Sequence, residues 1–304
     1  MRAIEQLFTA AGCRGWLCVR DVDGDGAAEL DAGDLVASAS VFKVAVGLEV
    51  ARQIETGELD PAHRIRLTAG ETTPGPTGFS RFEHDVEASV SDLLGAMMAI
   101  SDNAATDALI DLVGVDAINA TTRGLGLAQT VLPGPLRDLL ADVAREVGYG
   151  SWTELSRASE PAGADRAALD LRIAESQGLA PAGGPRTTAA EMAQLLCLIW
   201  RDEAAAPAAC ARVRRAMAGQ ITRQRLASGF PRSVGVVAKS GSLGGVIRNE
   251  VGVVTRPDGR RLAAAVFTRA PAPGIGEREI NAAIGGAAAA AIGHLAGCRS
   301  GYPR

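Results

Sequence analysis

Strand-like patterns occur at both ends of this chain, while helical patterns fill almost everything between them. Residues 16–21 alternate like a strand near the N-terminus, and residues 234–239, 246–254 and 262–269 form three further strand-like runs near the C-terminus. Because strands need partners in a sheet to be stable, the two ends are expected to meet in one layer. We predict an α/β fold of the α+β type, in which an antiparallel sheet is flanked by helices and carries an inserted all-helical lobe.

Turn and capping signals agree with this order of elements. Residues 21–26 are rich in Asp and Gly and predict a hairpin turn. The same segment half-matches a calcium loop, but Ala32 stands where a bidentate glutamate is needed, so the turn is the better interpretation. Residues 256–259 predict a second hairpin, and Thr188 followed by Glu191 predicts a capped helix start. Helices are expected at 40–56, 91–99 and 277–296.

Charge and hydropathy favour a small-molecule partner over nucleic acid or a membrane. The net charge is −4, no basic stretch is interleaved with aromatics, and no apolar run reads as a membrane span. The first 15 residues predict an amphipathic helix rather than a secretory signal. The chain as written is therefore expected in the cytoplasm, or outside the cell if a natural leader was removed.

We expect one catalytic domain over residues 1–304, acting as a monomer. Its α/β lobe is predicted at 1–58 and 195–304, and its helical lobe at 59–194. The five cysteines, at 13, 18, 197, 210 and 298, match no metal-binding spacing. We predict that four or five of them are buried reduced thiols, and we expect no metal and no cofactor.

Two lysines, Lys43 and Lys239, are the only ones in the chain, since 29 of the 31 Lys and Arg residues are arginine. Compositional drift away from lysine would explain this ratio without chemistry, but it makes the remaining two more informative. Arginine stays protonated in a protein, whereas a desolvated lysine can lose its proton and act as a base. Because both lysines lie in short serine motifs, the sequence predicts a serine nucleophile activated by lysine.

Three short motifs carry this prediction. Ser40 and Lys43 form Ser-x-x-Lys at a helix start, where free N–H groups favour an oxyanion. Residues 101–103 are Ser-Asp-Asn, which alone would indicate a helix cap. Residues 239–241 are Lys-Ser-Gly at the end of a Val-rich strand. In this order, the three motifs are the set found in class A β-lactamases and penicillin-binding proteins.

The chain is therefore similar to the class A β-lactamase-like serine hydrolases over nearly its whole length, apart from residues 130–186. The resemblance implies a β-lactamase/transpeptidase-like fold with the active site between the two lobes. It implies that Ser40 is the acylated nucleophile and that Lys43 is its base. It also implies that Ser101 relays a proton to the leaving nitrogen and that Lys239 is the electrostatic partner of Ser101.

The same resemblance implies a set of substrate-binding residues. Arg248 follows Lys239 by nine residues, which is the spacing of an arginine that binds a substrate carboxylate in many class A enzymes. The backbone N–H groups of Ser40 and Ser242 would form the oxyanion hole. The implied substrate-binding residues are Asn103, Ser240, Gly241, Ser242 and Arg248.

The sequence departs from this family in the ω-loop. Class A enzymes carry Glu-x-x-Leu-Asn there, and the glutamate activates the deacylating water. No such sequence occurs between Ser101 and Thr187. Glu154 and Glu175 are the candidate replacements, although each also fits a solvated helix carboxylate.

These features predict an acyl hydrolase that cleaves a β-lactam or a related cyclic or acyl amide through a Ser40 acyl-enzyme. Two alternatives stay open. One is an esterase, D-peptidase, amidase or transacylase for a different acyl donor, and the other is a covalent penicillin sensor that stays acylated. A Ser-His-Asp hydrolase is disfavoured, because Gly-x-Ser-x-Gly is absent and the three histidines lie in unrelated contexts.

Overall fold

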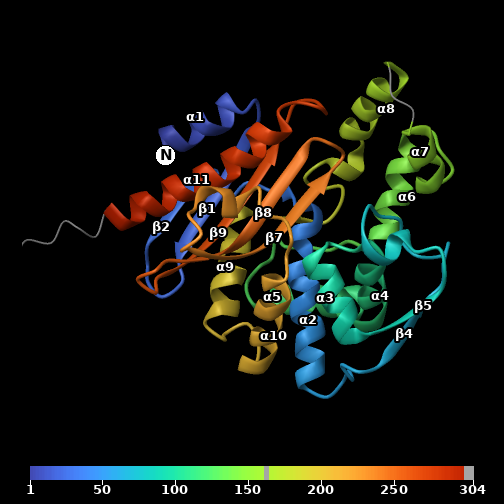
Figure 1. Ribbon diagram of the computed structural model, residues 1–304, viewed down its shortest axis with the longest axis horizontal. Coiled ribbons are helices and arrows are strands. Elements are labelled where there is room, and N and C mark those ends of the chain that lie inside the picture. Colours follow the sequence, from blue (N-terminus) through green and yellow to red (C-terminus); the bar gives the residue numbers. More distant parts are fainter. Residues whose placement is uncertain (161–163, 298–304) are drawn as a thin grey trace, which may run out of the picture.

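The computed structural model describes residues 1–160 and 164–297, and its centre is a five-stranded antiparallel sheet (Figure 1). The strands are β1 (Arg14–Asp21), β2 (Ala27–Leu30), β7 (Gly235–Leu243), β8 (Ile247–Thr255) and β9 (Arg261–Arg269). Their order is β2-β1-β9-β8-β7, so the two ends of the chain meet where β1 pairs with β9. The predicted fold class is confirmed.

Both predicted hairpins connect strands of this sheet. The Asp- and Gly-rich segment joins β1 to β2, and Arg20 lies opposite Ala27. Residues 256–259 join β8 to β9, and Thr255 lies opposite Arg261. The interpretation of the first segment as a turn is thereby confirmed.

Helices cover both faces of the sheet (Figure 1). One face carries α11 (Glu277–Gly297) with α1 (Arg2–Ala10) beside it, and α9 (Ala189–Trp200) packs against β1, β8 and β9. Because both faces are covered, β8 and β9 are buried along almost their whole length. The α9 helix begins at the predicted cap, where the Thr188 hydroxyl accepts a hydrogen bond from the Glu191 N–H at 3.0 Å.

A second layer of helices is arranged around α2 (Lys43–Glu55). Its neighbours are α3 (Val90–Ala99), α4 (Asn103–Val113), α5 (Val115–Gly124) and α10 (Pro207–Ala218). Most residues of α2 are buried, as in any helix surrounded by other elements. Its first residue, Lys43, therefore lies inside the protein from the start of the helix.

The remaining elements surround these two layers. Three helices follow the α5 region, namely α6 (Leu136–Glu146), α7 (Trp152–Ala158) and α8 (Ala164–Glu175). Two small sheets pair β3 (Val36–Ala37) with β6 (Arg186–Thr187) and β4 (Arg64–Leu67) with β5 (Val86–Ser89). The lobe boundaries at 58/59 and 194/195 stay predictions, and α9 crosses the second of them.

Within residues 1–160 and 164–297, no helix combines the length and hydropathy needed to cross a bilayer. In the same described parts of the chain, no three His, Cys, Asp or Glu side chains gather as a metal site. Cys13, Cys18, Cys197 and Cys210 are buried free thiols, and burial raises the pKa of each. Cys298 lies outside the described residues.

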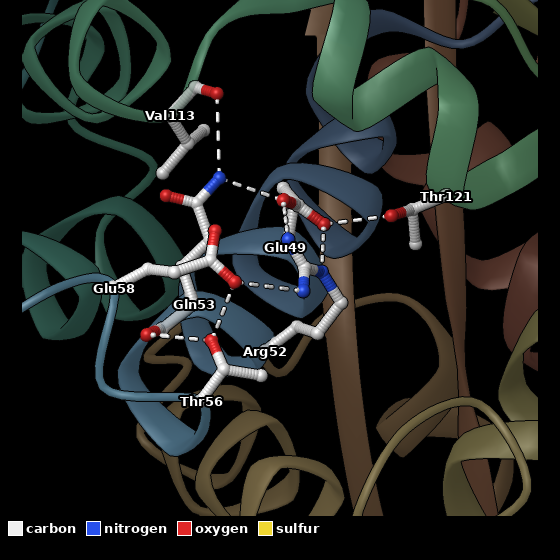
Figure 2. Close-up of polar contacts among 7 residues, drawn as sticks. All are labelled: Glu49, Arg52, Gln53, Thr56, Glu58, Val113 and Thr121. Atoms are coloured by element: carbon white, nitrogen blue, oxygen red, sulfur yellow. Dashed lines mark hydrogen bonds and ion pairs between the residues drawn. The ribbon is translucent and has the colours of Figure 1, made fainter.

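A buried carboxylate fixes α2 to its neighbours (Figure 2). Glu49 is fully buried and accepts hydrogen bonds from Arg52 at 2.8 and 2.9 Å, from Gln53 at 2.7 Å and from Thr121 of α5 at 2.6 Å. Burial alone would raise the pKa of Glu49, but these hydrogen bonds hold it below the usual value. The cluster therefore joins the middle of α2 to α5.

We expect Glu49→Ala to lower the free energy of unfolding by about 2–3 kcal/mol, because it leaves buried donors without an acceptor. This loss is below the roughly 3–5 kcal/mol of a fully buried pair, since Arg52 is 34% exposed and can turn into water. Urea unfolding measures the change. Glu58→Ala, which removes an exposed partner of the same arginine, should stay close to wild type; equal losses in both variants would contradict this role of Glu49.

Candidate active site

A cavity of about 210 Å³ lies where β7 meets the turn η1 (Ala39–Phe42) and the junction of α3 with α4. Most of the residues that the sequence singled out are brought together here. Lys43 and Lys239 are fully buried and bond to a residue that lines the cavity. The predicted residues that line it directly are Ser40, Ser101, Asn103, Ser240, Gly241 and Ser242.

Ser40 lies in η1, a 3-10 turn that precedes α2, rather than in the first turn of an α-helix as expected. The preceding Ala39 has a φ of 45°, a left-handed conformation that is unfavourable for a residue with a side chain. Neighbouring contacts hold this turn. Asn249 of β8 donates from Nδ2 to the carbonyls of Ala37 and Ser38, both at 3.0 Å, and the Ser38 N–H donates to the Pro185 carbonyl.

Gly241 allows β7 to lie against the turn that carries Ser40. A Cβ atom at this position would lie 2.9 Å from the Ser40 nitrogen and 3.1 Å from the Ser38 oxygen. Only glycine fits without moving one backbone away from the other. The Lys-Ser-Gly motif therefore has a steric reason for its glycine as well as a chemical reason for its lysine.

Ser101 is the meeting point of the two lysines. Its hydroxyl lies 3.1 Å from the Lys43 Nζ and 3.0 Å from the Lys239 Nζ. The backbone of Ser101 is left-handed, with a φ of 61°, which is unusual for serine and costs of order 1–3 kcal/mol. A hydroxyl that accepts hydrogen bonds from both amines keeps its own proton free to donate.

Lys43 donates hydrogen bonds to the Ser-Asp-Asn segment. Its Nζ donates to the Ser101 carbonyl at 2.7 Å, to the Ser101 hydroxyl and to Asn103 Oδ1 at 3.0 Å. No hydrogen bond joins it to the Ser40 hydroxyl in the part of the chain that the structure describes. Burial lowers the pKa of Lys43 to about 7, although the charges of Asp102 and Asp107 oppose this.

Lys239 is equally buried. Its Nζ donates to the Ser101 hydroxyl and to the Ser240 carbonyl at 2.8 Å. Burial lowers the pKa of Lys239 well below its usual value, and the positive charge of Lys43 lowers it further. The two amines are therefore coupled through one hydroxyl, and the protonation of each depends on the other.

The other members of the Ser-Asp-Asn motif hold the surrounding loops. Asp102 is the N-cap of α4, as predicted, and accepts from the Ala105 N–H at 3.2 Å and the Phe79 N–H at 2.5 Å. Asn103 accepts from Lys43 and donates from Nδ2 to the Pro74 carbonyl at 2.8 Å. Its side chain is thus oriented before any ligand is bound.

Arg248 is not brought to the cavity, contrary to the expectation of a carboxylate-binding residue. Its guanidinium donates to the Gly245 carbonyl at 2.8 Å and pairs with Glu277 at the start of α11 at 2.9 Å. A different arginine, which the sequence analysis missed, lies closer. Arg225 donates to the Ser242 hydroxyl at 2.6 Å and to the carbonyls of Gly241 and Asn249, both at 2.8 Å.

Glu154 and Glu175 also lie elsewhere. Glu154 is exposed and accepts from the Gly150 N–H at 2.9 Å, next to the start of its own helix. Glu175 lines a separate cavity of about 860 Å³, together with Arg14 and Trp16. Neither carboxylate lines the cavity that contains Ser40.

The α6 helix supplies an apolar wall instead. Leu136, Leu139 and Leu140 line the cavity. Buried Asp107 of α4 holds the start of this helix, because it accepts from the N–H groups of Leu136 at 2.7 Å and Arg137 at 2.8 Å. Residues 136–140 are Leu-Arg-Asp-Leu-Leu. They keep the spacing and the fourth-position leucine of Glu-x-x-Leu-Asn, but leucine replaces both the glutamate and the asparagine. This spacing is the one sequence signal that could have located the segment beside the cavity.

Comparison with known proteins agrees with this geometry. Residues 1–295 match the β-lactamase enzyme family. Over 286 residues the chain is 29% identical to the β-lactamase regulatory protein BlaB of Streptomyces cacaoi, with 90% of each protein covered. A β-lactamase from Sphaerobacter thermophilus has a similar structure, with a TM-score of 0.76, 24% identity, and coverage of 100% of this chain and 98% of that one. A mutant of PBP-A, solved as an acyl-enzyme complex with penicillin G, gives a TM-score of 0.73 at 18% identity, with 96% of each chain covered.

The fold is thus that of class A β-lactamases and penicillin-binding proteins. With the match over almost its whole length, the chain belongs to the β-lactamase enzyme family.

We expect the Lys43 side chain to titrate near pH 7, charged below this value and neutral above it, because its pKa is lowered from 10.5 to about 7. Lysine labelled with ¹³C gives two side-chain NMR signals, which Lys43→Arg assigns. Since the unfolded chain holds this proton up to a higher pH, the contribution of Lys43 to stability should rise with pH between about 7 and 10.5. A midpoint at the ordinary value of 10.5 would contradict a dominant effect of burial on the pKa of Lys43.

Proposed function

We propose that this protein is a serine acyl-transfer enzyme that forms an acyl-enzyme at Ser40 with a β-lactam or a related acyl amide and releases it slowly. The observation that carries the proposal is the Ser101 hydroxyl, which lies between two buried lysine amines in the same cavity as Ser40. Such an arrangement provides a removable proton, a base and a fixed charge within one site.

In the acylation step, the Ser40 oxygen attacks the amide carbonyl and gives its proton to neutral Lys43. A base of this kind works best with a pKa near the operating pH, which fits the value of about 7 for Lys43. The amine must release one of its present hydrogen bonds to take this proton. The N–H groups of Ser40 and Ser242 stabilise the oxyanion, which is worth about 3–4 kcal/mol per donor.

In the second half of acylation, the C–N bond breaks and the nitrogen takes the proton of the Ser101 hydroxyl. That hydroxyl recovers its proton from Lys43, so the proton taken from Ser40 ends on the leaving nitrogen. Lys239 stabilises the negative charge that develops on the Ser101 oxygen during this transfer. Asn103, Ser240 and Gly241 bind the substrate amide beside these groups.

Deacylation requires a base that activates water, and the lining of the cavity supplies no carboxylate for it among the described residues. We assign Leu136 to the position of the class A glutamate, because residues 136–140 keep the spacing of Glu-x-x-Leu-Asn and Leu136 lines the cavity. Its side chain can neither orient a water molecule nor accept a proton. We therefore propose that acylation is fast relative to deacylation.

A covalent sensor is the second candidate function. It is favoured by the same apolar wall, since a sensor must keep its acyl group, and by the similarity to a protein named as a β-lactamase regulatory protein. A third candidate is an esterase, D-peptidase, amidase or transacylase for a neutral acyl donor. It is favoured by the ion pair that draws Arg248 away from the cavity. A small-molecule acyl donor and action as a monomer in the cytoplasm are further parts of the proposal.

We expect a reactive penicillin to label Ser40 in a burst of one acyl group per chain, followed by slow turnover. Mass spectrometry of the intact protein and peptide mapping measure the adduct. Lys43→Arg keeps the charge but cannot accept the proton, and should slow labelling by about 10²–10⁴-fold. Labelling that survives Ser40→Ala, or fast linear turnover without a burst, would reject the proposal.

Leu136→Glu should accelerate deacylation by about 10²-fold, because it places a carboxylate on the wall of the cavity at the start of α6. Leu136→Gln is the matched control, with the same shape but no basic group, and should stay as slow as wild type. The decay of the acyl-enzyme after removal of free penicillin measures both. Equal decay in the two variants would mean that Leu136 does not limit the reaction.

A further inference from the structure

A buried acidic residue lies behind the strand that carries Lys239, and the mechanism above does not use it. Glu250 of β8 is 1% exposed and lies directly opposite Ser240 of β7. Its Oε1 accepts from Gln220 Nε2 at 3.0 Å, and its Oε2 accepts from the Leu226 N–H at 2.5 Å. Burial raises the pKa of Glu250 above its usual value, and the hydrogen bonds from Leu226 and Gln220 oppose this rise, as do the charges of Arg225 and Lys239.

Gln220 transmits the orientation of Glu250 to the site. Its amide has one donor end and one acceptor end, and the carboxylate of Glu250 binds the donor end. The acceptor end must then face the other way, where it receives the Ser240 N–H. The carbonyl of the same residue, Ser240, accepts from Lys239 Nζ at 2.8 Å. Hydrogen bonds thus connect Glu250 through Gln220 to the backbone of Ser240, and the carbonyl of that residue binds Lys239, which donates to the Ser101 hydroxyl.

Different acidic residues act on the two lysines. Asp102 and Asp107 face Lys43 from α4, and their charges raise its pKa. Burial lowers the pKa of Lys239, the charges of Lys43 and Arg225 lower it further, and the charge of Glu250 raises it. Burial lowers the pKa of Arg225, and the charge of Arg248 lowers it further. The charges of Glu250 and Glu277 raise it. Glu250 is therefore the acidic group whose charge acts on Lys239.

We propose that Glu250 is a positioning residue for Lys239, which fixes the backbone of Ser240 through Gln220 and supplies a negative charge that acts on the Lys239 ammonium. The catalytic consequence rests on the proposed function, but the position and charge of Lys239 do not. Glu250 touches neither the cavity nor a reacting atom. It acts on the chemistry only through the residues between it and Ser101.

The test compares Glu250→Gln with wild type by NMR titration of the lysine side chains. The two lysines give two signals, so Lys239 is observed directly and without a substrate. Loss of an opposing charge should lower the midpoint of Lys239 by about one pH unit or more. A midpoint within about 0.3 unit of wild type would overturn the proposal. A Lys239 signal that stays neutral over the whole titration of the wild-type protein would overturn it as well, because Glu250 would then face no charge.

Two further variants separate positioning from general damage. Glu49→Gln removes a carboxylate that is equally buried but is bound by Arg52, Gln53 and Thr121 (Figure 2). It should leave the Lys239 midpoint unchanged even where it lowers stability. Glu250→Asp keeps the charge but shortens the reach to Gln220, so the Ser240 N–H should exchange faster with deuterium while Lys239 stays closer to wild type. Protection of the Ser240 N–H that is unchanged in this variant would argue against the Gln220 relay.

The acylation rate provides the functional reading of the same variants. If Ser40 reacts with penicillins, Glu250→Gln should lower the rate at saturation by about tenfold or more and leave the half-saturating concentration nearly unchanged. It should also shift the pH profile, which Glu49→Gln should not do. A wild-type protein that never acylates would reject the proposed function, and the NMR result would still decide the role of Glu250.

Discussion

The contact of two buried lysine amines with one serine hydroxyl is the interaction on which the rest of this structure depends. Lys43 comes from α2, Ser101 from the junction of α3 and α4, and Lys239 from β7, so the contact joins the helical layer to the sheet. Two amines cannot both carry a full charge in a dry interior without opposing charges. Acidic groups supply opposing charges for both amines. Asp102 and Asp107 raise the pKa of Lys43, and Glu250 raises the pKa of Lys239.

The cavity has two chemically different sides. The polar side is held by a network of charged and hydrogen-bonded groups, and it is arranged for the transfer of protons. The other side is made of leucines from α6, and Asp107 ties the start of that helix to α4. In the proposed function, the polar groups serve the formation of an acyl-enzyme, whereas the apolar wall bears on its removal. The proposed imbalance between the two steps therefore follows from the composition of two separate elements.

The fold could be predicted from the sequence because its signals are local. The alternation of residues 16–21, the hairpin turns and the Thr188 cap each depend on a few neighbouring residues. The residues of the three short motifs also come together as expected. Their proposed roles still depend on the chemistry that the experiments above address.

Other features could not be predicted, because they depend on contacts between distant segments. The spacing of nine residues from Lys239 places Arg248 on a particular strand, but its guanidinium bonds to the Gly245 carbonyl and to Glu277 of α11 rather than lining the cavity. Arg225 and Glu250 have no motif of their own, and only the structure shows that each bonds to groups around β7. Leu136 could not be predicted as a site residue, because its apolar side chain carries no reactive group and only the structure shows that it lines the cavity.

The burial of both lysines also determines how the surface of this protein reacts. Strained lactams, activated esters and aldehydes attach to proteins mainly at exposed, neutral amines. Lys43 and Lys239 are fully enclosed, and the other basic side chains outside the histidines are arginines, which stay protonated and do not attack such groups at neutral pH. A reactive acyl donor consequently meets no lysine amine on the outside of the molecule, and the proposed nucleophile Ser40 would face correspondingly little competition.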